Sequence, residues 1–160
     1  SAGAGATVAG ITIDPKGQFL FAADSANNKI ASFSISAAGV LTPVAGSPFN
    51  TGTTPMAIAV DSTSAFLYSA NQGSNNVSGF KISGGALTEM AGSPYTLVTT
   101  GTPQPVFLTV DVSNTFLYVA NVGTTNISAF AIKAADGTLS LLTTSPFPQS
   151  VEPLWIVTTQ

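Results

Sequence analysis

The chain has 160 residues, of which only 7% are charged, and its formal net charge is −3. Its four basic residues are scattered lysines, so the sequence lacks the clustered cations that nucleic-acid binding requires. The absence of cysteine excludes disulfides and thiolate metal sites, and no apolar run approaches the roughly 20 residues of a membrane-spanning helix, so we expect no insertion into a membrane.

Short segments rich in β-branched and aromatic residues begin near the N-terminus. The first covers residues 11–14, the second residues 19–24 and the third residues 29–35. Asp14-Pro15-Lys16-Gly17 lies between the first two and has turn chemistry, because Asp accepts backbone hydrogen bonds, Pro fixes φ and Gly permits a positive φ. No segment keeps a 3.6-residue apolar period, so the pattern predicts antiparallel strands and almost no helix.

A fourth strand is expected between Gly39-Val40-Leu41 and Ser47-Pro48-Phe49. Pro48 has no N–H to donate, which places it on an outer edge strand. The first four segments together make one unit of four short strands.

The same unit then returns twice along the chain. Phe19-Leu20-Phe21-Ala22-Ala23-Asp24 is repeated as Phe66-Leu67-Tyr68-Ser69-Ala70-Asn71 and as Phe116-Leu117-Tyr118-Val119-Ala120-Asn121. The apolar strand that ends in Asp, the Gly-x-Leu step and the Ser-Pro-aromatic step recur in the same order, ending in Ser93-Pro94-Tyr95 and Ser145-Pro146-Phe147. Repeats of about this length with four strands each are typical of β-propeller blades.

This pattern resembles the YVTN repeat of surface-layer and lactonase-like seven-bladed β-propellers over residues 6–153. We therefore predict an all-β partial propeller in a single domain of residues 1–160. Its blades of four antiparallel strands cover approximately residues 6–55, 56–105 and 106–153, and an extra strand covers residues 154–160.

Three blades leave the family's ring open, and each open end would expose an apolar face. Three interpretations remain: the chain is a fragment of a longer propeller, it assembles with other copies or a partner chain, or it polymerises head to tail. We expect self-association or contact with other propeller blades. The low charge and the many Ser and Thr residues favour an extracellular or cell-surface location.

Candidate site residues are few. Asp14, Asp61 and Asp111 occupy the same strand end in the three repeats, where carboxylates from several blades could bind Ca²⁺. We favour the alternative that each Asp caps its own turn, so no metal or other cofactor is expected and the three remain weak metal candidates. Asp24, Asn71 and Asn121 share a second equivalent position and are interpreted as hydrogen-bonding residues rather than ligands.

The chain also has no histidine and no arginine. By resemblance, lactonase-type propellers use His, Arg and Glu in the central channel, and here only Glu89 and Glu152 remain of that set. We therefore expect no catalytic residue and no enzyme activity, but a structural or protein-interaction module. The alternatives are a fragment of a 6-phosphogluconolactonase-like hydrolase and a carbohydrate- or Ca²⁺-binding module.

Overall fold

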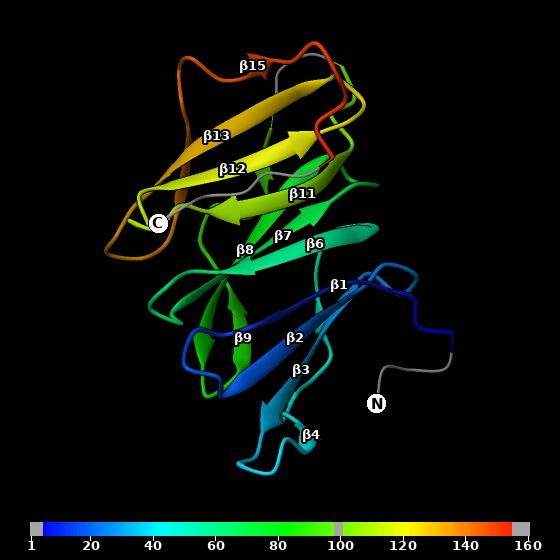
Figure 1. Cartoon of the computed structure of the whole chain (residues 1–160), viewed down its shortest axis with the longest axis vertical. Coiled ribbons are helices and arrows are strands. Elements are labelled where there is room, and N and C mark those ends of the chain that lie inside the picture. The colour runs from blue at the N-terminus through cyan, green and yellow to red at the C-terminus, as the bar shows by residue number, and fades with distance from the viewer. Residues whose placement is uncertain (1–4, 98–100, 155–160) are drawn as a thin grey trace.

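The computed structural model describes residues 5–97 and 101–154, and within these ranges it is all-β (Figure 1). Fifteen strands form three separate antiparallel sheets that follow one another along the long axis of the molecule. The described residues contain no helix, and so none that could cross a membrane. The predicted class, an all-β partial propeller with blades of antiparallel strands, is confirmed.

Each sheet uses five consecutive strands, and we call the sheets the first, second and third blade. The first contains β1 (Val8–Ile13), β2 (Phe19–Asp24), β3 (Lys29–Ile35), β4 (Leu41–Pro43) and β5 (Phe49–Asn50). The second contains β6 (Pro55–Val60), β7 (Phe66–Asn71), β8 (Asn76–Ser83), β9 (Ala86–Glu89) and β10 (Tyr95–Thr96). The third contains β11 (Pro105–Val110), β12 (Phe116–Asn121), β13 (Asn126–Ile132), β14 (Leu139–Leu141) and β15 (Phe147–Pro148).

The outer strand of every blade is split in two, which the sequence pattern did not predict. In the first blade, β4 and β5 both pair with β3 and are separated by a turn in which the Ser47 N–H donates to the Val44 carbonyl. The Ser47 hydroxyl accepts a 2.9 Å hydrogen bond from the N–H of Ser32, in the middle of β3. This hydroxyl provides an acceptor for a strand N–H at the break.

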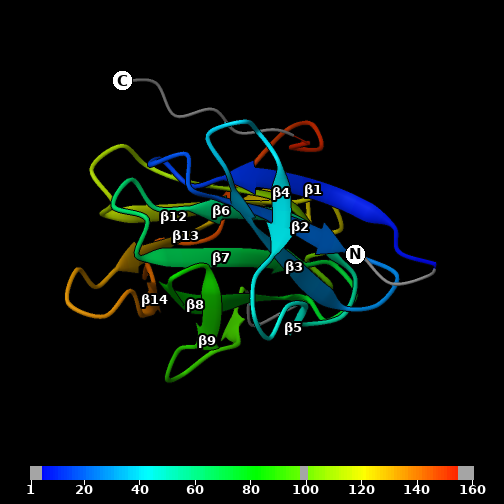
Figure 2. The ribbon, with the colours of Figure 1, turned by 90° about the horizontal axis from the view of Figure 1, so that it is seen from below.

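The inner strands β1, β6 and β11 lie side by side along one side of the molecule. Seen from below, β1 and β6 lie on one side and the outer strands β5 and β9 on the other (Figure 2). The domain boundaries and the closing strand stay predictions: Leu154 is exposed and not in a strand, and residues 155–160 lie outside the described part of the chain.

The hydrophobic core consists of two layers, each between neighbouring blades. The layer between the first and second blades contains Phe21, Ile30, Leu67 and Phe80, and the second layer is built around Tyr68. Because each layer takes side chains from two sheets, a blade depends on its neighbours for much of its apolar burial. We call these two layers the seams.

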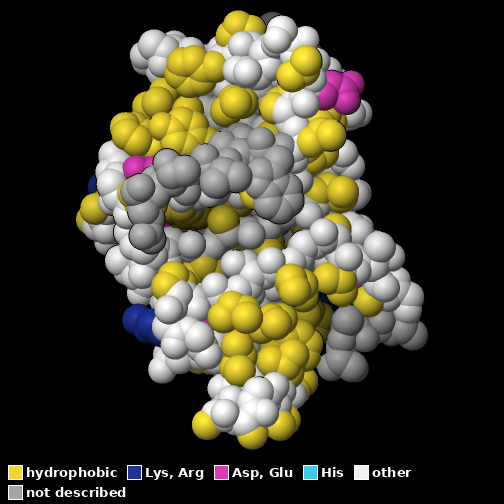
Figure 3. Space-filling model, viewed as in Figure 1, with side chains coloured by type: hydrophobic (Ala, Val, Ile, Leu, Met, Phe, Trp, Pro, Cys, Tyr) yellow, Lys and Arg dark blue, Asp and Glu magenta, His cyan; other side chains and the backbone are white. Residues whose placement is uncertain are grey.

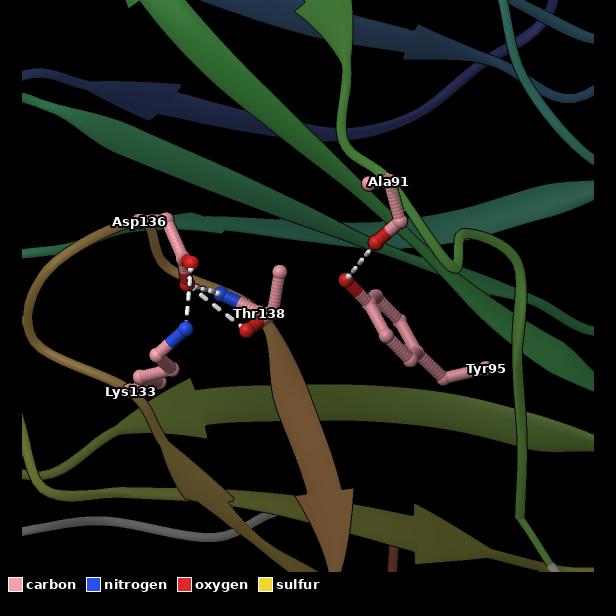
Figure 4. A network of polar contacts seen from close by, with 5 residues as sticks. All are labelled: Ala91, Tyr95, Lys133, Asp136 and Thr138. Atoms are coloured by element: carbon pink, nitrogen blue, oxygen red, sulfur yellow. Dashed lines mark hydrogen bonds and ion pairs between the residues drawn. The ribbon is translucent and has the colours of Figure 1, made fainter.

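A buried hydroxyl crosses each seam to a glycine carbonyl in the following blade. Ser32 donates to the Gly85 carbonyl at 2.7 Å, and Tyr68 donates to the Gly137 carbonyl at 2.7 Å. The loop that carries Gly137 is held by Lys133 and Asp136, whose side chains form an ion pair at 2.8 Å (Figure 4). The hydrogen bond from Lys133 holds the pKa of Asp136 well below its usual range, with the Thr138 hydroxyl and N–H adding to the effect.

Candidate functional site

The candidate carboxylate Asp14 follows β1 directly and accepts hydrogen bonds from its own turn. Its Oδ1 accepts from the N–H groups of Gln18 at 2.7 Å and Phe19 at 2.6 Å, and its Oδ2 accepts from the Lys16 N–H at 3.1 Å. The Ser64 hydroxyl of the second blade donates to the same Oδ2 at 2.8 Å. Asp14 therefore fixes one turn and also links two blades.

Asp61 and Asp111 repeat this geometry in the second and third blades. Asp61 Oδ1 accepts from the Phe66 N–H at 2.7 Å, and Asp111 Oδ1 accepts from the Phe116 N–H at 2.7 Å. Thr63 and Ser113 each donate a hydroxyl hydrogen bond to the second carboxylate oxygen.

Burial and hydrogen bonding act in opposite directions on two of these carboxylates. Burial alone would raise the pKa of Asp14, but hydrogen bonds from Phe19, Ser64 and Gln18 outweigh it and lower the pKa. For Asp111, the hydrogen bonds from Ser113 and Phe116 outweigh burial in the same way and lower its pKa. Both groups are therefore ionised turn caps near neutral pH.

The structure does not bring the three carboxylates into one metal site. In the described ranges, no three side chains of the Asp, Glu, His or Cys type lie close enough together to hold a metal ion. Each carboxylate of Asp14, Asp61 and Asp111 already accepts at least four hydrogen bonds, most of them from its own turn. Their geometry accounts for them as turn caps without a ligand.

The second repeated position, at the end of the second strand, forms a small polar cluster. Asn71 Nδ2 donates to Asn76 Oδ1 and to Ser78 Oγ, each at 2.9 Å, and Asn121 Nδ2 makes the same pair of bonds in the third blade. In the first blade Asp24 accepts instead, from Thr7 and Asn27. The Asn71 and Asn121 bonds join the second and third strands of the second and third blades, whereas Asp24 binds the segment before β1 and the turn after β2.

A hollow of about 380 Å³ lies over the inner strands β1, β6 and β11. The side chains that line it are all apolar and come from all three inner strands: Ala9, Ile11, Met56, Ile58, Val106 and Phe107, together with Leu154. These side chains can pack against an apolar surface, but none can donate a proton or act as a nucleophile. In the described residues, the hollow therefore supplies a wall without a reacting group.

A second cavity, of about 340 Å³, lies between the turns of the second and third blades. Asp61, Thr63, Ser113, Asn114 and Thr115 line it above an apolar floor. Several of these polar side chains already form hydrogen bonds within the protein. Asn114 Oδ1 accepts from the Ser62 N–H and Asn114 Nδ2 donates to the Ser62 hydroxyl, while the Ser113 hydroxyl donates to Thr115 and Asp111. The sequence analysis missed this cavity, because it arises only where two blades meet.

Known proteins share both the sequence pattern and the fold of this chain. The sequence profile of the family described as Lactonase, 7-bladed beta-propeller, matches residues 2–96. The chain belongs to this family. The resemblance predicted from the repeats is therefore confirmed. No curated protein matches the sequence at a significant level.

Solved propellers superimpose on this lactonase-family chain along most of its length. A candidate 6-phosphogluconolactonase from Bacteroides uniformis has a TM-score of 0.82 at 18% identity, covering 93% of this chain and 43% of the other. A second candidate 6-phosphogluconolactonase, from Bacteroides fragilis, has a TM-score of 0.74 at 20% identity, covering 90% of this chain and 39% of the other. The periplasmic gluconolactonase of Pseudomonas aeruginosa has a TM-score of 0.72 at 24% identity, covering 85% of this chain and 40% of the other. The chain thus spans about two fifths of these proteins.

The prediction that the chain is not an enzyme is wrong, because the family to which it belongs is a lactonase family. The main interpretation of the sequence was a non-catalytic module. The family match and the shared fold support a lactonase-like propeller instead. The error came from composition: the absence of His, Arg and Cys describes three blades only. In a ring, the reacting groups can lie on other blades.

Proposed function

We propose that these three blades form part of a lactonase-type propeller that hydrolyses a sugar lactone. The family match over residues 2–96 carries this proposal, and the fold shared with gluconolactonase propellers supports it. The substrate class follows from those relatives, whose names specify gluconolactone and its 6-phosphate.

Lactone hydrolysis requires a group that activates water and donors that stabilise the oxyanion. The hollow over the inner strands offers apolar side chains and no such group among the described residues. A phosphorylated substrate would also need a cation, and none of the four lysines lines the hollow. We therefore assign the wall of the channel to this chain, and the water-activating and anion-binding groups to the other blades of the ring.

A chimeric propeller tests this proposal. In it, residues 5–153 replace the matching blades of the Pseudomonas aeruginosa gluconolactonase, and gluconolactone hydrolysis is followed by acid release at constant pH. We expect the chimera to hydrolyse gluconolactone and the isolated 160-residue chain to show no rate above buffer. The parent enzyme serves as the positive control.

Two results would contradict the proposal. A chimera that melts cooperatively as a complete ring yet hydrolyses no lactone would show that these blades do not fit a lactonase channel. An isolated chain that hydrolyses gluconolactone would show that the reacting groups lie on these blades after all.

A further inference from the structure

The cavity of about 340 Å³ between the second and third blades lies at the turns that follow β6 and β11. These two strands are neighbours and point the same way, so their turns meet at one end of the two blades (Figure 1). Every described residue that lines the cavity belongs to these two blades, both of which are present in the chain. Small-molecule sites commonly have volumes of about 300–1,000 Å³, and this cavity is within that range.

At the first seam, a hydroxyl bridges the corresponding corner. Ser64 of the second blade donates to Asp14 Oδ2 of the first blade at 2.8 Å. Asn114 is the equivalent of Ser64 in the third blade, and their φ angles are 55° and 62°. The Asn114 side chain binds Ser62 instead: its Oδ1 accepts from the Ser62 N–H at 2.9 Å, and its Nδ2 donates to the Ser62 hydroxyl at 2.6 Å. The cavity therefore lies beside Asp61, where the first seam has the bridging hydroxyl.

Asp61 lines the cavity although it is only 2% exposed. Its carboxylate accepts the N–H groups of Ala65 and Phe66, together with the N–H and the hydroxyl of Thr63. Because Thr63 gives its one hydroxyl hydrogen to Asp61, its oxygen keeps lone pairs for a donor that enters the cavity. The carboxylate thus orients the Thr63 hydroxyl as an acceptor for a ligand.

The third blade adds hydrogen-bonding groups on the opposite wall. Asn114 uses one of its two Nδ2 hydrogens on Ser62, which leaves a second N–H for a ligand. The Thr115 hydroxyl lies 2.7 Å from the Ser113 hydroxyl, and both residues are exposed and line the cavity. Groups that donate and groups that accept hydrogen bonds therefore line one cavity from both blades.

The rest of the lining is apolar and consists of Phe66, Ile132 and Ala134. The Phe66 ring is held in place by the next blade, because a Cβ on Gly137 would overlap it. Ile132 is buried beside it. A pyranose sugar needs both kinds of contact, since its carbon face packs on apolar side chains and its hydroxyls both donate and accept hydrogen bonds.

Charge decides which hydroxylated ligand fits this cavity. Only 7% of the residues are charged, and Figure 3 shows few charged side chains on the face that it presents. Of the described residues that line the cavity, Asp61 alone is charged, so an anionic ligand would meet a negative charge without a balancing cation. A metal cation would have to displace hydrogen bonds that the carboxylate already accepts. A neutral sugar meets neither obstacle.

We propose that this cavity binds a neutral pyranose sugar at the junction of the second and third blades. Thr63, Asn114 and Thr115 exchange hydrogen bonds with the sugar hydroxyls, and the carbon face of the sugar packs on Phe66. The site is separate from the hollow over the inner strands, because the two have no lining residue in common among those described. It therefore adds carbohydrate binding to the lactone hydrolysis proposed for the complete ring.

Titration of the chain with D-glucose, followed through its amide NMR signals, tests the proposal. We expect saturable shifts at Thr63, Asn114 and Thr115, with a Kd on the order of 1 mM for so small a ligand. D-Glucuronate has the same ring with a carboxylate in place of one CH₂OH group. It should bind at least about tenfold more weakly than glucose, because of the charge on Asp61.

Three variants locate the site. Asn114→Ser gives the third blade the residue that the second has at Ser64, so the new hydroxyl should bridge to Asp61 and close the cavity. The affinity for glucose should then fall at least about tenfold. Thr115→Val removes one exposed hydroxyl at nearly constant shape and should weaken binding about threefold to tenfold. Thr42→Val, on exposed β4 of the first blade, is the matched control and should bind glucose like the unchanged chain.

Other outcomes overturn the proposal. A chain without saturable shifts in glucose has no such site, and glucuronate binding as tight as glucose binding would contradict the selection of a neutral sugar. Equal affinities of Thr115→Val and Thr42→Val would place the sugar elsewhere, and this comparison decides even if Asn114→Ser unfolds the chain. The readout is binding at the junction of two blades, so failure here leaves lactone hydrolysis by the complete ring untouched.

Discussion

A single carboxylate organises each turn between the first two strands of a blade. Asp14 accepts two short backbone hydrogen bonds, at 2.6 and 2.7 Å, and it is almost fully buried. Its replacement would leave the N–H groups of Gln18 and Phe19 without their acceptor and Ser64 without its link across the seam. Asp14 therefore stabilises both its own turn and the packing of the second blade on the first.

We expect Asp14→Ala to lower the free energy of unfolding by roughly 2–4 kcal/mol, because buried donors without partners each cost roughly 1–3 kcal/mol. Urea unfolding followed by circular dichroism measures the change. Asp111→Ala is the matched comparison and should cost less, since among the described residues all donors to its carboxylate come from its own turn and the strand that follows. Equal losses would mean that the Ser64 link contributes nothing.

Acid should weaken the fold through the same carboxylates. Hydrogen bonds outweigh burial and lower the pKa of Asp14, Asp24 and Asp111 from the ordinary value of 3.8. Because the folded pKa is the lower one, the stabilisation is complete above about pH 4 and is lost as the pH falls through the folded values. The urea midpoint should therefore be flat from about pH 7 to pH 5 and drop below about pH 4. A midpoint that rises on acidification would contradict these directions.

At the scale of the strands, the repeats predicted much of the fold because their signals are local. The second strand, Phe19–Asp24, and the third, Lys29–Ile35, have the predicted bounds. The Asp-Pro-Lys-Gly turn was also predictable, because its hydrogen bonds are local in sequence. Gly17 donates to the Asp14 carbonyl, and the Asp14 carboxylate accepts from the Phe19 N–H. The split outer strand was not, because pieces of two or three residues have no measurable period. The seam contacts join residues about 50 to 70 positions apart, beyond the reach of any local pattern.

The Ser of each Ser-Pro step has a structural role that the sequence did not reveal. Ser145 Oγ accepts the N–H of Ala129 at 3.1 Å, as Ser93 Oγ does for Gly79 at the same distance. We expect Ser145→Ala to lower the free energy of unfolding by about 1–2 kcal/mol, since a central strand N–H loses its partner. Ser140→Ala, at the one exposed residue of β14, is the control and should change the free energy of unfolding by less than about 0.5 kcal/mol. Both changes are measured by urea unfolding, and equal effects would remove this role.

At the scale of the whole molecule, stability resides between the blades as much as within them. Leu67 and Phe80 reach 0% and 2% exposure only because the first blade covers them. A change at a seam therefore acts on two blades together, while the same change on an open face acts on one blade alone.

Tyr68 and Tyr118 provide the matched pair for this difference, because they occupy the same position in the second and third blades. Tyr68 donates to the Gly137 carbonyl from a fully buried position, and that burial raises the pKa of its hydroxyl. Tyr68→Phe leaves this carbonyl buried without its donor, so we expect a loss of about 1–3 kcal/mol in the free energy of unfolding. Tyr118→Phe removes a half-buried hydroxyl from the open face and should cost less than about 0.5 kcal/mol in dilute, monomeric protein. Thermal unfolding at low concentration compares the two, and equal losses would show that the hydroxyl crossing the seam does not hold the blades together.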